Sequence, residues 1–120
     1  MTILVSLNIY SGRSAPEWHL DPGDAERLSL LLQGLPPGGH PPGGGLGYHG
    51  VLLSFEVAAP WLEATLFEGV VDALRRDGEP ELRIDTGRRV ERWVLATGLC
   101  VHGELIRPIL LGLGDPAAGA

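Results

Sequence analysis

A run of glycine and proline in the middle of the chain limits its possible folds more than any other feature. Residues 36–47 read PPGGHPPGGGLG, with four prolines and six glycines among twelve residues. Proline removes backbone N–H donors and glycine adds chain freedom, so we expect neither helix nor strand here. Loops of this length inside a compact domain are uncommon, and they are either functional or disordered. We therefore predict a flexible loop over 36–47.

The segments on either side of this loop carry clear periodic patterns. Apolar residues recur at every second position in 2–10 and again in 51–57, which predicts two half-buried strands. Residues 22–34 have apolar residues at helical spacing instead. Asp21 is placed to cap this helix, and Pro22 occupies its first position, where a missing N–H costs nothing.

Two later segments decide the fold class. The stretch 60–76 fits a helix by its leucine spacing, but Gly69 and its β-branched residues favour strands, which is the interpretation we adopt. Asp77-Gly78 is then a turn into a further strand. Residues 87–103 predict a long helix that is apolar on more than one side, as in a helix flanked by protein or an oligomer contact.

These elements predict a small α+β domain with an antiparallel sheet packed against two helices. The sheet is built from 2–10, 51–57 and 62–74. The length of 120 residues fits one domain, which we place at 1–111, followed by a disordered tail over 112–120.

Composition excludes several classes of protein. The formal charge is -6, which argues against a nucleic-acid-binding protein, and no apolar run is long enough to span a bilayer, so we expect no membrane partner. All nine basic residues are arginine. Without lysine there is no Schiff-base amine, no phosphate-loop lysine and no Ser–Lys pair.

The single cysteine and the N-terminus indicate a cytoplasmic protein. Cys100 has no second cysteine with which to form a disulfide, and its apolar neighbours predict a buried thiol. The first residues show no basic region or cleavage site of a secretory signal. We therefore expect a reducing compartment.

The histidines do not predict a metal site. None of the four lies in a recognised metal-ligand spacing, although the loop would allow His40 and His49 to approach each other. No serine lies in a nucleophile elbow, and the glycines at 43–47 lack the strand-before and helix-after context of a dinucleotide site. We expect no metal and no cofactor.

Four residues beside the loop and the first strand form the candidate site. Arg13 follows a strand end, where functional side chains are often presented, and Trp18 follows it closely. Tyr48 and His49 stand between two glycines where the loop joins the next strand. Because both segments leave the sheet as irregular backbone, we expect a shared ligand- or partner-binding site of Arg13, Trp18, Tyr48 and His49.

A second charged group lies at the start of the 87–103 helix. Arg88, Arg89 and Arg92 are placed to meet an anionic ligand or an acidic partner surface. The alternative is a solvated helix face with local ion pairs such as Arg88–Glu91. The sequence leaves both interpretations open.

Three short motifs resemble a family of small, uncharacterised microbial proteins. The family pattern is SGRPNPxW, then LGYxG, then D-x-GR-x-x-E-x-W. Here the chain has Ser11-Gly12-Arg13 with Pro16 and Trp18, then Leu46–Gly50, then Asp85–Trp93; it departs at Ser14-Ala15, where the pattern has Pro-Asn. The resemblance covers about residues 3–99 and implies a shared fold but no activity.

Two functions fit these observations. The first is a non-enzymatic accessory or binding module that engages a protein partner or small ligand near the Gly/Pro loop. The second is a small enzyme of specialised metabolism with a pocket under the loop. The absence of a recognisable acid–base or nucleophile pair favours the module. A homo-oligomer through the 87–103 helix is a further expectation.

Overall fold

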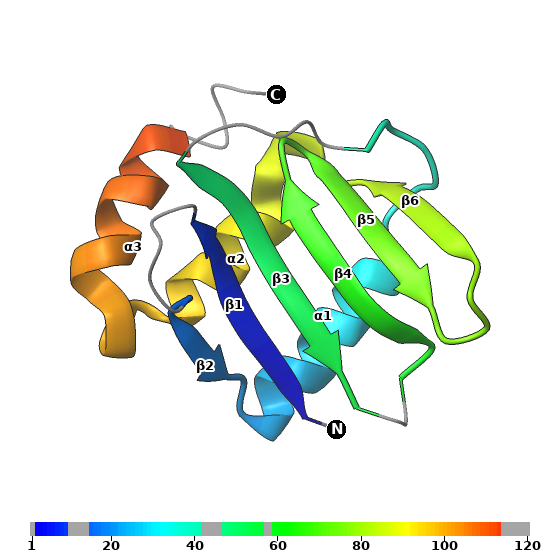
Figure 1. The fold of residues 1–120 in the computed structure, drawn as a ribbon, viewed down its shortest axis with the longest axis horizontal. Coiled ribbons are helices and arrows are strands. Elements are labelled where there is room, and N and C mark those ends of the chain that lie inside the picture. The colour runs from blue at the N-terminus through cyan, green and yellow to red at the C-terminus, as the bar shows by residue number, and fades with distance from the viewer. Residues whose placement is uncertain (1, 10–14, 42–46, 57–58, 114–120) are drawn as a thin grey trace.

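A computed structural model describes residues 2–9, 15–41, 47–56 and 59–113 of the chain. It is an α+β domain with a six-stranded antiparallel sheet and three helices, so the predicted fold class is confirmed; two of the helices lie behind the sheet and the last lies at its side (Figure 1). The strands are β1 (Ile3–Ile9), β2 (Glu17–His19), β3 (Tyr48–Phe55), β4 (Trp61–Phe67), β5 (Val70–Arg75) and β6 (Pro80–Ile84). The helices are α1 (Pro22–Gln33), α2 (Arg89–Thr97) and α3 (Leu99–Leu113), with the short 3-10 helix η1 (Thr86–Arg88) before α2.

The sheet order is β2-β1-β3-β4-β5-β6, with every neighbouring pair antiparallel. α1 carries the chain from β2 back to β3, and β3 to β6 then form a meander. Alternate residues of the strands point toward the helices because strand side chains alternate between faces. The core consists of these strand residues and the inward residues of the helices, among them Val5, Val51, Leu66, Leu28, Val94 and Ile106.

The strand interpretation of 60–76 is confirmed by β4 and β5, and the turn at Asp77-Gly78 lies where it was expected. The predicted cap of the first helix is also present. The Asp21 carboxylate accepts from the backbone N–H of Asp24 at 2.8 Å, and Pro22 is the first helical residue. β2 is an additional strand that the sequence pattern did not predict.

The single helix predicted over 87–103 is wrong. The segment contains two helices that separate at Gly98, and the second continues to Leu113, two residues into the segment expected to be a tail. A Cβ on Gly98 would come within 2.7 Å of both Ile106 and the Trp18 ring. Glycine is therefore the residue that lets these two side chains pack against the junction. The rest of that tail, 114–120, lies outside the described residues.

The start of the Gly/Pro segment lies along the edge strand β6. The N–H of Ile84 donates to the Pro36 carbonyl at 2.8 Å, and the N–H of Gly38 donates to the Leu82 carbonyl at 3.0 Å. Residues 36–41 form no helix or strand of their own, only an isolated bridge. They pair part of the edge of β6, which would otherwise present unpaired backbone groups.

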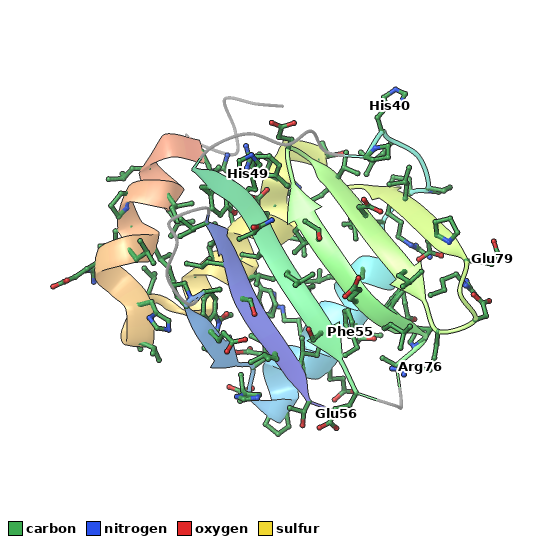
Figure 2. The ribbon with its side chains drawn as sticks, viewed as in Figure 1. His40, His49, Phe55, Glu56, Arg76 and Glu79 are labelled. Carbon is green, nitrogen blue, oxygen red and sulfur yellow. The ribbon has the colours of Figure 1, made fainter. Side chains whose placement is uncertain are left out.

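An arginine fixes the connection from the end of β3 to the start of β4. The Arg76 guanidinium donates to the backbone carbonyls of Phe55, Glu56, Ala59 and Trp61 at 2.6–3.4 Å. Figure 2 shows Arg76 beside this turn. Because its donors satisfy carbonyls that leave the sheet, Arg76 stabilises the turn.

β3 carries a bulge next to its first residues. Two residue steps separate Leu7 from Ile9 in β1, but three separate their partners Val51 and Tyr48 in β3. The extra residue shifts the alternation, so that Tyr48 lies on the same side of the sheet as Val51. Gly50 has a φ of 92°, and a Cβ there would lie 2.3 Å from the Leu66 carbonyl oxygen.

We predict that Gly50→Ala destabilises the fold by at least about 3 kcal/mol, since it combines left-handed backbone with a clash against β4. Gly78→Ala is the matched control, because Gly78 has a φ of 91° and a Cβ added to it would meet no heavy atom within 4 Å. It should cost about 1–2 kcal/mol. Urea unfolding of both variants measures the difference, and equal costs would contradict the close approach at Gly50.

Candidate functional site

Three stretches of chain that are far apart in sequence meet at one end of the strands. We call this end of the sheet the upper edge, and it lies at the top of Figure 1. It is formed by the end of β1 with the start of β3, the turn between β4 and β5, and residues 85–88 that lead into α2. Ile9 pairs with Tyr48, and the N–H of Asp85 donates to the Gly69 carbonyl at 2.7 Å.

A buried carboxylate connects these stretches. Glu91 has no exposed surface, and its Oε2 accepts from the Tyr48 hydroxyl at 2.5 Å. The Arg88 guanidinium donates to the same carboxylate through Nε at 2.9 Å and Nη2 at 2.7 Å. This two-point contact fixes the plane of the guanidinium as well as its position.

The backbone around Arg88 is held by a second buried acid. Both Asp85 carboxylate oxygens accept from backbone N–H groups at the start of α2, those of Val90 at 2.9 Å and Glu91 at 3.1 Å. Gly87 and Arg88 have φ values of 68° and 57°. A non-glycine residue in this region is strained, and such strain is often found at functional sites.

Aromatic rings gather around Phe67 at the same edge. The Arg88 guanidinium carbon lies 5.2 Å from the centre of the Phe67 ring, a cation–π contact. The rings of Tyr48 and His49 lie 5.7 Å and 5.5 Å from the same ring. The Arg88 side chain remains 24% exposed, so one side of this arrangement faces solvent.

The electrostatics of the group follow from burial and from the Arg88–Glu91 pair. Burial, reinforced by the Glu91 charge, raises the pKa of Tyr48 far above its ordinary value of 10.0. Burial lowers the pKa of Arg88, but its bonds to Glu91 more than offset this and the net change is upward. Tyr48 therefore stays protonated and Arg88 stays charged at neutral pH.

The structure brings two of the four predicted site residues together. Tyr48 and His49 lie together at the upper edge, and the His49 ring contacts the Gly47 carbonyl through Nδ1 at 2.9 Å. Trp18 is buried in β2 opposite Val5, and its Nε1 donates to the Thr97 hydroxyl at 2.9 Å. Arg13 lies outside the described residues. Trp18 thus packs against the end of α2, away from the Tyr48–Glu91 contact.

The Arg88–Glu91 ion pair was one of the two alternatives in the sequence, and it is present. The solvated helix face that went with it is only partly present, because Arg89 is exposed but Glu91 is fully buried. Sequence reasoning missed Phe67 and Asp85 as members of this edge. The sequence pattern around them gives little indication of this role. Phe67 resembles any other apolar strand residue, and Asp85 resembles a helix cap.

The remaining chemical candidates lie apart from the upper edge. His40 is exposed and well separated from His49 in Figure 2, and the described residues contain no group of histidine, cysteine or acidic residues able to hold a metal. The prediction of a buried Cys100 is wrong, because this residue follows the helix break and is exposed. No helix among the described residues combines the length and apolar character needed to cross a membrane.

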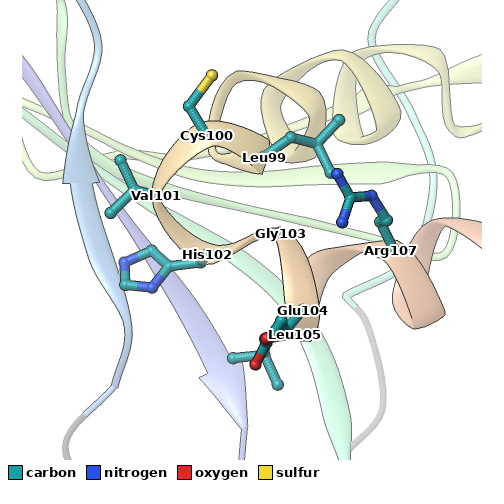
Figure 3. Close-up of a pocket in the computed structure, with 8 residues that line it drawn as sticks. All are labelled: Leu99, Cys100, Val101, His102, Gly103, Glu104, Leu105 and Arg107. Atoms are coloured by element: carbon teal, nitrogen blue, oxygen red, sulfur yellow. The ribbon is translucent and has the colours of Figure 1, made fainter.

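An open hollow of about 490 Å³ lies at the start of α3. Figure 3 shows it bounded by side chains of one continuous segment, which includes Val101, His102 and Arg107. His102 departs from helical geometry with a φ of -129°, so α3 is kinked at this residue. The hollow is separate from the Tyr48–Glu91–Arg88 network.

Comparisons with protein-family models, with curated proteins and with solved structures find no match to this chain. The resemblance to the uncharacterised microbial family therefore stays a prediction. Two of the motifs on which it depends do contact each other here, since Tyr48 comes from the second and Glu91 from the third.

We predict that Asp85→Ala costs about 2–4 kcal/mol of stability, because it leaves two buried N–H donors without acceptors. Asp21→Ala removes a cap from the exposed start of α1 and should cost about 1 kcal/mol. Chemical denaturation of the two variants gives the comparison. A cost for Asp85→Ala no greater than that for Asp21→Ala would show that the buried cap is not needed.

The raised pKa of Tyr48 predicts a loss of stability at alkaline pH. Above about pH 10 the unfolded chain releases the Tyr48 proton while the folded chain retains it, so unfolding becomes more favourable as pH rises. Tyr48→Phe should cost about 1.5–3 kcal/mol at pH 7, because Glu91 loses a donor. The variant should also lose stability less steeply than the natural chain above pH 10. Unfolding midpoints measured across pH 7–11 test this, and parallel curves would contradict it.

Proposed function

We propose that this protein is a non-enzymatic accessory module of the cytoplasm that binds a protein partner through its upper edge, beside the end of the Gly/Pro loop. Arg88, stacked on Phe67 and held by Glu91, is the central contact residue. Tyr48 and His49 extend the same surface. The observation that carries this proposal is a partly exposed arginine held in a fixed orientation by a fully buried carboxylate.

The energetic cost of this arrangement supports a binding role. Removing a carboxylate from water costs several kcal/mol, and apolar residues of similar volume often stabilise a fold at least as well as a buried ion pair. The Glu91–Arg88 contact is therefore poorly explained by stability alone. What it provides is one fixed geometry for the guanidinium, at a residue with strained backbone.

The residue types at this edge favour a protein as the partner. Arginine and aromatic side chains are enriched where protein interfaces concentrate their binding energy, and rigid side chains lose less entropy on binding. With Nε and one Nη2 hydrogen committed to Glu91, the Arg88 guanidinium has further N–H donors for carbonyl oxygens of a partner. Because Glu91 balances its charge, these donors suit neutral backbone carbonyls better than a free anion.

The same contacts favour binding over catalysis. The Tyr48 hydroxyl donates to Glu91, and its raised pKa makes it a poor acid at neutral pH. The Glu91 carboxylate is occupied by Tyr48 and Arg88 and has no exposed surface. For the cytoplasm, the supporting feature is the exposed thiol of Cys100, which suits a reducing compartment.

Site-specific photo-crosslinking in the native host tests the proposal. A photoreactive residue at Glu68, which is exposed in the turn of the upper edge, should crosslink one defined protein. The same residue at Leu62, which is exposed at the other end of β4, is the matched control and should not capture that protein. Equal capture from both positions, or none from Glu68, would overturn the proposal.

With the captured protein purified, Arg88→Lys should weaken its binding about tenfold, since lysine keeps the charge but loses the planar fork. Arg27→Lys is the control, because Arg27 makes a cation–π contact with Trp93 away from this edge. Calorimetry measures both affinities, and thermal melts check that each variant is folded. Conversion of a metabolite by the chain would instead support the alternative, a small enzyme.

A further inference from the structure

The face of the sheet that is turned away from α1 and α2 carries half-buried leucines among its polar residues. Figure 1 views this face, with both helices behind the sheet. Its centre consists of side chains from β3, β4 and β5, which the register places in two rows, Leu52–Thr65–Asp72 and Ser54–Glu63–Leu74. We call these residues the outer face. A sheet with one solvated face ordinarily has polar residues on that side, so the half-buried Leu52 and Leu74 depart from the usual pattern.

The charges of the outer face have one sign. Glu63 is exposed and Asp72 is half-buried, and neither forms an ion pair within the described part of the chain. Because Glu63 is in register with Leu74 and Asp72 with Thr65, the two acids are diagonal neighbours on adjacent strands, about 7–8 Å apart in sheet geometry. Like charges at this separation repel each other. The arrangement therefore costs the free fold stability.

The arginines lie elsewhere in the structure. Arg75 and Arg83 both pair with Glu81, whose carboxylate also accepts from the buried Trp61 ring, so these side chains lie on the helix side of the sheet. The other described arginines belong to helices or to the turn after β5. Among the described residues, the outer face thus has no arginine to offset its two acids, and the chain has no lysine.

The width of the outer face matches one helix. Adjacent strands lie about 4.8 Å apart, so the distance from β3 to β5 is about 10 Å, which is the diameter of an α-helix with its side chains. A helix laid along β4 contacts Leu52 on one side and Leu74 on the other, with Glu63 between them. Helices cover the opposite face of the same sheet, so a further helix on this face completes a layered arrangement.

We propose that the outer face binds an amphipathic α-helix of another protein, one that places arginine or lysine side chains opposite Glu63 and Asp72. Apolar residues of the same helix pack on Leu52 and Leu74. Charge complementarity selects this occupant, because an acidic or neutral helix would remove the two carboxylates from water without giving them a cation. The inference is independent of the proposed binding at the upper edge, which lies at the strand ends.

Titration with a synthetic peptide tests the charge requirement. The probe is a helical peptide of about five turns with leucine on one face and lysine on the other, and its control has glutamate in place of lysine. The lysine peptide should bind, should shift the NMR amide signals of β3, β4 and β5 more than those of α1 and α3, and should bind more weakly as salt is added. Equal binding of the two peptides, or shifts centred on the helices, would overturn the proposal.

A pair of charge-removing variants tests the residues. Glu63→Gln combined with Asp72→Asn should weaken binding of the lysine peptide about tenfold or more. The matched control combines Glu26→Gln and Glu104→Gln, which removes the same number of charges from exposed positions on α1 and α3 and should change the affinity less than about twofold. Equal weakening would indicate general attraction to an acidic chain and would overturn the proposal. Sedimentation of the chain alone should show a monomer, and self-association that Glu63→Gln with Asp72→Asn abolishes would make a second copy the occupant instead.

The repulsion argument has its own test in the free protein. Glu63→Gln with Asp72→Asn should raise the midpoint of thermal unfolding, because it removes the like charges from neighbouring strands. The Glu26→Gln and Glu104→Gln control should leave the midpoint nearly unchanged. A lower midpoint for the outer-face variant would show that the two acids serve the fold, and the proposal would then lose its basis.

Discussion

The buried carboxylate of Glu91 is the interaction on which the upper edge of this domain depends. It accepts hydrogen bonds from the Tyr48 hydroxyl and the Arg88 guanidinium. One side chain therefore joins the bulged start of β3 to the left-handed turn before α2. A buried carboxylate that lost these donors would retain its desolvation penalty without compensation. The bulge, the turn and the start of α2 are therefore required together.

Two arginines show how the same side chain serves different purposes at opposite ends of the sheet. The Arg76 guanidinium donates to four backbone carbonyls and so fixes a turn. Arg88 is held by a carboxylate beneath it and lies over Phe67 with part of its surface in solvent. The first arrangement stabilises a turn, whereas the second presents a rigid donor at the molecular surface.

The features that followed from the sequence are those set by local periodicity and capping. Alternation identified β1 and β3, and Asp21 with Pro22 located the start of α1, because these signals act within a few residues. The break at Gly98 was missed because it depends on packing of Trp18 and Ile106, which are distant in sequence. Phe67 was missed as a site residue for a similar reason, because the bulge at Gly50 and the turn before α2 bring Tyr48 and Arg88 to it.

Arg92 connects the upper edge to the end of α3. Its Nε donates to the Gly87 carbonyl at 3.1 Å, and its Nη2 donates to the Leu113 carbonyl at 2.6 Å. Gly87 precedes Arg88 in the strained turn, so the position of the α3 end and that of the proposed contact residue are held by one side chain.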